Sequence, residues 1–376
     1  MSFSTFIILC LEGMLLSFNV AASSALIPSI AADFGVSQFI AGRIVWFYML
    51  PYGVAALVYG PLIRIIDAKR VELFCILGFA AANLMVGFAG DITTLFIARF
   101  LMGIFGASVI PLALILIARH KAPQEKGRFV GIFFSTTFAA SLLGLFLSGV
   151  IAWRWIYFIP AIAGFVLSLV ILLYLPSFKK EADSLRVNYP AVFKNRAIIG
   201  IFTYIFLVSL FYHGVQQWLS VYFSERYSFG QFIISALLTL TSVSGILGEV
   251  LGGRLADSLG RVRTAGLGII LMAASVFILL LKAPLFFLAA LMIIWGLGWT
   301  FNHAGISTLL TDVPDKYLNE SASLNSSVRF ISGGLGAALG GILIQKGFQV
   351  WLFIFGACIL SLIIFNKKEK AWARIY

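Results

Sequence analysis

The stretch GRLADSLGRVR, residues 253–263, holds four charged side chains, whereas the sequence on either side of it is almost free of charge. The whole chain of 376 residues is 61% hydrophobic and only 11% charged, well below the charged fraction of an ordinary soluble domain. Charges gathered into short segments between long apolar ones are typical of membrane-protein loops. The stretch therefore predicts a loop between two membrane-spanning helices in a multi-pass membrane protein.

Apolar segments long enough to cross about 30 Å of hydrocarbon as helices follow one another along the chain. They fall near residues 4–28, 40–61, 72–89, 93–118, 130–151, 156–175, 198–222, 232–252, 264–281, 284–310, 320–344 and 349–366. The first segment lacks the basic start of a signal peptide, so we expect it to be retained as a spanning helix. The pattern predicts an all-α integral membrane protein with twelve transmembrane helices.

Lysine and arginine are distributed unevenly between the two sides of such a chain. If the N-terminus is cytoplasmic, 20 of the 27 basic residues fall in cytoplasmic segments and five in outer ones. Because basic residues stay on the cytoplasmic side during insertion, we predict that both termini are cytoplasmic, in the cell (inner or plasma) membrane. The net charge of +12 is spread in small groups rather than on one domain face, which argues against a nucleic-acid partner.

The sequence carries no sign of a metal, another cofactor or a catalytic centre. Its three cysteines are scattered inside apolar segments, with neither a disulfide framework nor the spacing of metal ligands. No GxxxxGK[ST] motif occurs, which disfavours ATP-driven transport by this chain alone. We therefore expect no cofactor, and we do not expect an enzyme.

Several short patterns recur at an almost constant offset, which indicates a duplicated unit. GPLIRIIDAKR begins at Gly60, and GRLADSLGRVR begins 193 residues later at Gly253. Further matching pairs are Gln38 and Gln231, Pro123 and Pro314, Gly144 and Gly336, and Gly149 and Gly341.

Because each copy holds six spans, the copies are parallel repeats, which place a substrate site near the midplane where the halves meet. We predict an N-terminal six-helix bundle over residues 1–175 and a cytoplasmic linker over 176–196. A C-terminal six-helix bundle with a short cytoplasmic tail follows over 197–376.

With these motifs the chain resembles the major facilitator superfamily, and within it the drug:proton antiporters. Gly253, Asp257, Gly260, Arg261 and Arg263 fit the GxxxDxxGRxR signature of that family's cytoplasmic loop. The resemblance implies secondary active transport by alternating access, with this loop acting as a gate. The fifth segment departs from the antiporter signature, because leucine replaces the signature's proline at position 145.

The physical properties of the loop are consistent with a gate. A glycine at a helix end permits a tight turn, and Asp257 can cap a helix N-terminus or pair with nearby arginines. In the first copy an arginine stands where the motif has its aspartate. A solvated positive-inside loop remains the alternative. The candidate gating residues are Gly60, Arg64, Asp67, Gly253, Asp257, Gly260, Arg261 and Arg263.

Glu12 lies inside the first apolar segment, where a charged group costs about 2.5–3.5 kcal/mol on insertion scales. Asn19 and Ser23 follow at helical spacings and place a polar stripe on the same face. A carboxylate removed from water holds a proton more readily, which suits a coupling group. We interpret Glu12 and Asn19 as candidates for proton or substrate binding, with structural pairing of Glu12, for example to an arginine, as the alternative.

Two arginines also fall inside predicted helices. Arg329 lies near the middle of the eleventh segment, with Asn325 one turn earlier, and it can pair with Glu12, bind an anionic substrate or meet backbone carbonyls. Arg99 lies in the fourth segment, where the resemblance implies a role in proton coupling or helix packing. Snorkelling of Arg99 to the outer interface is the alternative.

Two histidines complete the set of candidate transport residues. His213 precedes Gln217 by one turn in the seventh segment, and Trp299 precedes His303 by one turn in the tenth. Histidine titrates in the range that coupling requires, although hydrogen-bonded core histidines are commoner. With Trp295 and Tyr212 nearby, the aromatic side chains can line a pocket for an aromatic or cationic solute.

The sequence favours a secondary transporter that couples export of small amphipathic molecules to protons. The alternative is a symporter or facilitator that takes up a small polar or anionic metabolite, which Arg329 and the altered fifth segment favour. A receptor or scaffold on the same fold is a further class. We expect a monomer in the lipid bilayer, with a small-molecule substrate and the proton as its partners.

Overall fold

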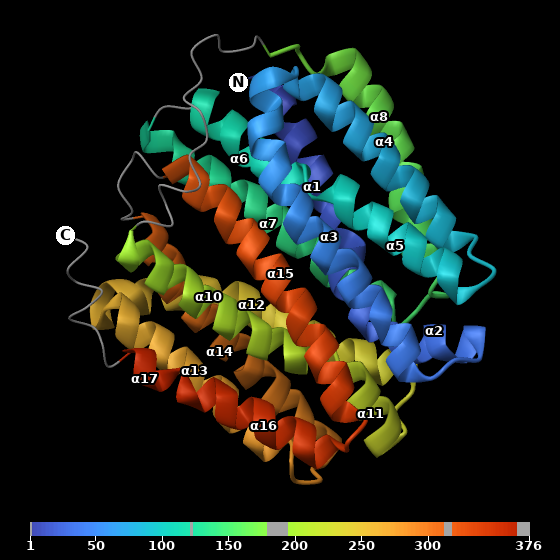
Figure 1. The fold of residues 1–376 in the computed structure, drawn as a ribbon, viewed down its shortest axis with the longest axis vertical. Coiled ribbons are helices and arrows are strands. Elements are labelled where there is room, and N and C mark those ends of the chain that lie inside the picture. Colours follow the sequence, from blue (N-terminus) through green and yellow to red (C-terminus); the bar gives the residue numbers. More distant parts are fainter. Residues whose placement is uncertain (1, 121–122, 179–194, 312–317, 367–376) are drawn as a thin grey trace. The chain divides into compact units, whose positions relative to one another are not determined.

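The computed structural model describes residues 2–120, 123–178, 195–311 and 318–366, and throughout these ranges the regular structure is helical (Figure 1). Residues 1–187 and 188–376 form two compact units, each of which is described by itself. Most of the predicted linker, residues 176–196, lies outside the described residues.

The first unit holds eight helices among its described residues. They are α1 (Phe3–Ala25), α2 (Ile27–Phe34), α3 (Gln38–Ile65), α4 (Ala68–Gly87), α5 (Ile92–Gly106), α6 (Val109–His120), α7 (Pro123–Leu147) and α8 (Trp155–Tyr174). In the second unit the described helices are α10 (Arg196–Gln216), α11 (Leu219–Tyr227), α12 (Gln231–Leu259), α13 (Arg261–Ile278), α14 (Leu285–Thr311), α15 (Leu318–Ile344), α16 (Phe348–Ser361) and α17 (Ile363–Asn366).

These helices confirm the predicted all-α membrane fold. Within the described residues, 11 helical segments are long and apolar enough to cross a membrane, and the shorter Phe348–Ser361 occupies the twelfth predicted position. Four of the predicted spans are divided between two described helices: α1 and α2, α5 and α6, α10 and α11, and α16 and α17. The first changes from α1 to α2 at Leu26, with Pro28 in the first turn of α2, where a missing N–H costs little.

The charged motif forms a sharper turn than the sequence predicts. Helix α12 continues to Leu259 and α13 begins at Arg261, so the turn is made at Gly260, whose φ of +92° suits glycine. Gly253 and Gly60 lie inside α12 and α3 rather than at helix ends, which corrects their predicted role as turn residues.

The two aspartates of the repeated motif have different local roles. Asp67 caps α4, because its Oδ1 accepts hydrogen bonds from the backbone N–H of Lys69 and Phe178, both at 3.1 Å. Asp257 is exposed on the last turn of α12, while Gly260 occupies the N-cap of α13, so the prediction that Asp257 caps a helix is wrong. One copy of the motif therefore uses its acid to start a helix, and the other uses a glycine.

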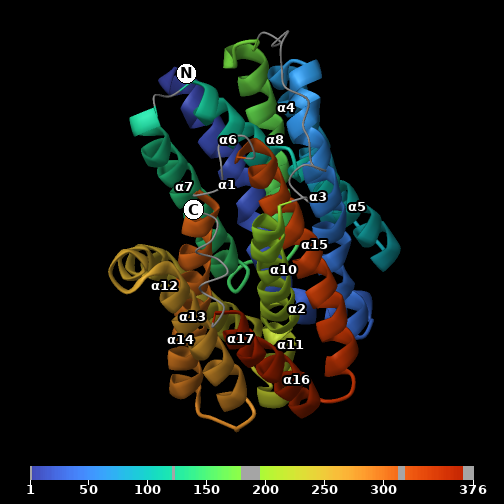
Figure 2. The same cartoon turned by 60° about the vertical axis from the view of Figure 1, so that its left-hand side comes forward.

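In the first unit, small residues let α1 and α7 approach closely. A Cβ added at Gly144 of α7 would overlap the carbonyl oxygen of Phe18, and the hydroxyl of Ser141 donates to the carbonyl of Ser17 at 3.1 Å. Helix α4 lies beside α8 in both views (Figure 2). Close backbone approach at small residues is the usual way in which membrane helices pack.

The second unit repeats this contact between α10 and α15. A Cβ added at Gly336 of α15 would overlap the carbonyl oxygen of Leu210. Leu210 and Gly336 each follow their counterparts Phe18 and Gly144 by 192 residues, the offset found in the sequence. The repeat is therefore expressed as the same helix contact inside each unit.

Arginine side chains fix the ends of α4 and α13 opposite the charged motif. In the first unit Arg154 pairs with Asp33 at 2.7 Å and donates to the carbonyls of Gly87 and Ala89. In the second unit Arg226 donates to the carbonyl of Leu280 at 2.9 Å. Both arginines satisfy carbonyls at a helix C-terminus, where positive charge is also favoured by the helix dipole.

The glycine contact predicts a difference between two glycines of the same helix. We expect Gly144→Ala to lower the stability of the protein by about 1–3 kcal/mol, because the added methyl group overpacks the contact with Phe18. Gly131→Ala, where nothing lies within 4 Å of the added Cβ, is the matched control and should be neutral or stabilising. Thermal unfolding of the purified variants measures both effects, and equal melting temperatures would contradict the contact.

Candidate functional site

Polar side chains of α1 point into the first unit and bind two neighbouring helices. The amide of Asn19 donates to the side-chain oxygen of Asn83 in α4, and Asn83 in turn donates to the carbonyl of Phe79 at 2.9 Å. The hydroxyls of Ser23 and Tyr157, in α8, lie 3.0 Å apart. These bonds hold α1 against α4 and α8, so the described contacts of Asn19 are those of a helix-pairing residue.

Glu12 lies on the same helix without such partners. Its side chain is 0% exposed, and neither carboxylate oxygen accepts a hydrogen bond from a described residue. The ionisable group that acts on it is Glu72 of α4, which is 1% exposed and equally without a hydrogen bond. Among the described residues no arginine pairs with Glu12, so the anticipated ion pair is not found there.

Arg99 is buried in the first unit rather than extended toward the outer interface. Only 1% of its surface is exposed, and its Nε donates to the carbonyl of Ile44 at 3.1 Å. Its guanidinium lies over the ring of Tyr48 at 4.5 Å and over that of Tyr157 at 5.9 Å. The burial rules out snorkelling, and the contacts give the charge a carbonyl and two π faces instead.

In the second unit, charged and polar side chains from four helices, α10, α12, α14 and α15, lie together. Glu249 of α12 bonds His303 of α14 at 2.6 Å, and Glu249 also acts electrostatically on Arg329 of α15. The Nε of Arg329 donates to Asn325 at 2.9 Å.

Arg329 acts on His213 of α10, and His213 is bonded to Gln217 at 3.1 Å. We call these six residues the C-terminal polar cluster: His213, Gln217, Glu249, His303, Asn325 and Arg329.

An aromatic wall borders this cluster. The rings of Tyr212 and Trp299 are stacked with their centroids 3.8 Å apart, and Trp295 lies parallel to Tyr212 at 5.0 Å. Trp295 donates its indole N–H to Gln216 at 2.6 Å, and His303 lies 6.2 Å from Trp299. The arrangement puts π faces beside an acid, a base and two amides, a combination that can bind an amphipathic molecule.

The predicted transport residues of the second unit are thus brought together, while Glu72 and Glu249 were missed. Both acids lie near the ends of predicted apolar segments, where a charge is expected at the membrane interface. A search for an isolated acid in an apolar run would have found Glu249, whereas Glu72 follows Lys69 and Arg70 closely and is grouped with the charged loop. Within the described residues no group of three metal-ligating side chains occurs, so nothing described there fits a metal.

The predicted gating residues show fewer side-chain contacts than the C-terminal polar cluster does. The side chain of Arg64 lies outside the described residues, while Arg263 and Asp257 are exposed. A Cβ added at Gly305 of α14 would come within 2.6 Å of the carbonyl oxygen of Arg261, so the start of α13 packs closely on α14. The role of the predicted gating residues as a gate stays a prediction.

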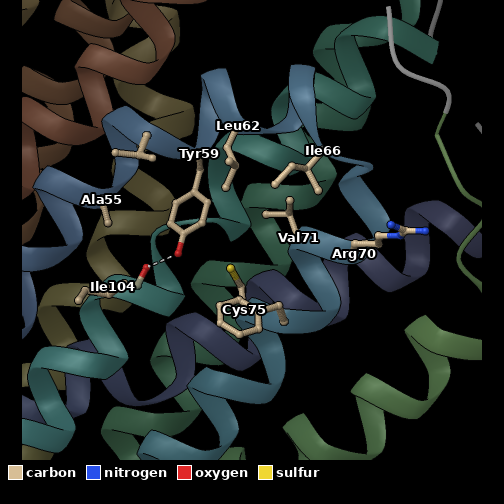
Figure 3. Close-up of a pocket in the computed structure, with 10 residues that line it drawn as sticks. Ala55, Tyr59, Leu62, Ile66, Arg70, Val71, Cys75 and Ile104 are labelled. Atoms are coloured by element: carbon tan, nitrogen blue, oxygen red, sulfur yellow. Dashed lines mark hydrogen bonds between the residues drawn. The ribbon is translucent and has the colours of Figure 1, made fainter.

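A separate apolar pocket of about 420 Å³ lies between α3, α4 and α5 (Figure 3). The hydroxyl of Tyr59 donates to the carbonyl of Ile104 at 3.0 Å, and Arg70 is the charged residue of the lining. Cys75 lies between this pocket and the two buried acids, since its thiol interacts with Tyr59 and lies near both Glu12 and Glu72. The lining is otherwise hydrophobic and offers few groups to orient a polar substrate.

Comparison with protein families gives a match to the Major Facilitator Superfamily over residues 9–337 and 228–371. An uncharacterised transporter of this type, YceJ of Bacillus subtilis (strain 168), is 25% identical over 93% of this chain and 94% of its own length. The purine ribonucleoside efflux pump NepI of Salmonella typhimurium (strain LT2) is 22% identical over 84% of this chain and 81% of its own length. The puromycin resistance protein pur8 of Streptomyces alboniger is 30% identical over 44% of this chain and 33% of its own length.

Solved structures with the same fold include several transporters. A bacterial homologue of the human lysosomal transporter Spinster, inward-facing and occupied, matches with a TM-score of 0.78 at 14% identity over 99% of this chain and 96% of its own. The peptide transporter POT in complex with sulfate matches with a TM-score of 0.79 at 12% identity, over 100% of this chain and 97% of its own. At these identities the likeness establishes the fold alone.

The Asn19–Asn83 bond predicts non-additive effects on stability. We expect Asn19→Ala or Asn83→Ala alone to cost about 1–3 kcal/mol, because each leaves a buried amide with an unsatisfied group. The double variant should cost less than the sum of the two, since it removes both members of the pair. Thermal unfolding of the four proteins measures this coupling, and strictly additive losses would show that the two amides act independently.

Proposed function

Since this chain belongs to the major facilitator superfamily, we propose that it exports small amphipathic molecules in exchange for protons. Membership makes it a multi-pass membrane transporter of a small molecule and not an enzyme. Relatives named as a puromycin resistance protein and a purine ribonucleoside efflux pump support export as the direction. We further propose that it works by alternating access as a monomer in the inner membrane, with both termini in the cytoplasm.

The observation that carries the substrate proposal is the C-terminal polar cluster with its aromatic wall. The side chains of Glu249 and His303 are each 29% exposed, so neither group is fully enclosed by the protein. A ring or cation of the substrate would lie against Trp299, while its polar atoms would bond the acid and the amides. One relative is named a purine ribonucleoside efflux pump, and a purine ribonucleoside combines an aromatic ring with polar groups, which agrees with such a site.

Glu12 is the group that we propose as the proton carrier. It is buried in α1 and has no cationic partner among the described residues, so its charge is not balanced there. A neutral, protonated carboxyl is favoured in such a place, and a change of conformation that admits water would release the proton. Arg99, which is held by a carbonyl and two rings, is proposed to position α5 against α3.

Uptake of a polar or anionic metabolite is the second candidate, and Arg329 favours it. The Nε of that arginine is bonded to the neutral amide of Asn325, so Glu249 is the acid described near its charge. A substrate carboxylate or phosphate would then help to balance the positive charge of Arg329. Such a substrate would make Arg329 the centre of the site in place of Trp299.

Flux into proteoliposomes with an imposed pH gradient tests the proposal. The panel contains puromycin, a purine ribonucleoside, a lipophilic cation and a small dicarboxylate. We expect a proton gradient to drive accumulation of one of the first three and not of the dicarboxylate. If the gradient drives movement of the dicarboxylate alone, export of amphipathic molecules is wrong, and uptake of a polar or anionic metabolite takes its place.

The aromatic wall predicts a selective effect on affinity. Trp299→Ala should raise the KM of the transported solute about two- to tenfold, because ring stacking contributes about 0.5–1.5 kcal/mol. Trp299→Phe keeps an aromatic face, so its KM should lie between that of wild type and that of Trp299→Ala. Trp155→Ala is the control, since that tryptophan is exposed in the other unit. An unchanged KM in Trp299→Ala would remove the wall from the binding site.

A further inference from the structure

Two buried carboxyl groups of the first unit have all four of their oxygens without a hydrogen bond from a described residue. They belong to Glu12 of α1 and Glu72 of α4, which are 0% and 1% exposed. Buried polar groups are nearly always paired, and an unpaired buried charge is far more costly than an unpaired neutral group. Four such oxygens in one place require an explanation.

The two carboxyl groups are neighbours. Each lies within the other's electrostatic reach and within range of a hydrogen bond to it. Two ionised carboxylates offer only acceptors, so a bond between them cannot form unless one holds a proton. A single added proton would therefore supply the missing donor and give both groups a partner.

No cation offsets this pair among the described residues. Its ionisable neighbours are the carboxylate of Asp67 and the thiol of Cys75, neither of which brings positive charge. The basic groups described on the surrounding helices are engaged elsewhere. Lys69 donates to the carbonyl of Leu172, Arg99 to that of Ile44, Arg154 pairs with Asp33, Arg43 lies over Phe39, and Arg70 and Arg128 are exposed.

We propose that Glu12 and Glu72 form one proton-binding site, in which a proton is shared between the two carboxyl groups. Like charges side by side in a medium of low dielectric cannot both ionise, so the pair keeps one proton and one negative charge. Uptake of a second proton makes the pair neutral, and its release restores the charge. Glu72, which the proposed export mechanism does not require, is thereby an equal member of the site.

This inference deepens the proposed proton coupling and rests on it for its role in transport. The pair joins α1 to α4 by a bond that depends on the proton. Glu72 lies in the second turn of α4, the helix that follows the first copy of the charged motif. Only if water entered the site and the remaining proton also left would two like charges face each other, and their repulsion would then drive the two helices apart at this point.

Infrared difference spectroscopy of the purified protein tests the pair without any transport. Wild type should show the carbonyl band of a protonated carboxyl that changes with pH. Glu12→Gln and Glu72→Gln should each abolish the wild-type band and shift the remaining acid, because each removes the partner of the other. If each variant instead loses one band of its own, and the two lost bands add up to the wild-type signal, the two acids are independent and the inference is overturned.

Transport measurements then test the role of Glu72. In proteoliposomes, Glu72→Gln, Glu12→Gln and the double variant should all lose the stimulation by a pH gradient to the same extent. All three should remain folded, which thermal unfolding of the purified variants measures. Glu125→Gln, an exposed acid on α7, is the matched control and should behave as wild type.

The two proposals fail in different ways. If wild type shows no stimulation by the gradient, the proposed proton coupling is wrong, while the infrared result still decides whether the pair exists. If wild type is stimulated and Glu72→Gln keeps full stimulation, the shared site has no part in coupling. Should thermal unfolding show that a variant is misfolded, the spectrum of Glu72→Asp, which retains the carboxyl, tests the shared site in its place.

Discussion

The structure depends on one constraint, the cost of leaving a polar group without a partner where water cannot reach it. In hydrocarbon the backbone satisfies this constraint by forming helices, and the charged side chains are confined to the short segments between them. Arg154 and Arg226 meet it by binding the carbonyls at the ends of α4 and α13. Polar groups that remain inside the helices must then be bonded, or they must exchange a proton or a substrate.

The two units satisfy this constraint differently. In the second unit the half-buried polar groups bond one another, as Glu249 does with His303 and Arg329 with Asn325. In the first unit Asn19 and Asn83 are bonded, but Glu12 and Glu72 are not. We propose that the second unit recognises a solute by hydrogen bonds and ring stacking, whereas the first holds a site that a proton completes.

Duplication explains how two units with one architecture can differ in chemistry. The contact of Gly144 with Phe18 recurs as that of Gly336 with Leu210, so the helix packing is shared. Glu12, Glu72, Glu249 and Arg329 have no charged counterpart 192 or 193 residues away. Packing at the glycines is therefore common to the copies, while the ionisable groups are particular to each.

Much of the fold could be predicted from the sequence, because hydrophobicity and chain length alone decide which segments cross a membrane and glycine spacing records the repeat. The sequence also predicted Glu12, Arg329, His213 and His303 as candidate site residues, since charged and polar groups are rare in apolar segments. It could not find that Glu72 is the neighbour of Glu12, or that Glu249 is the partner of His303. Those pairings join residues from different helices, and only the packing of the helices against one another determines which side chains meet.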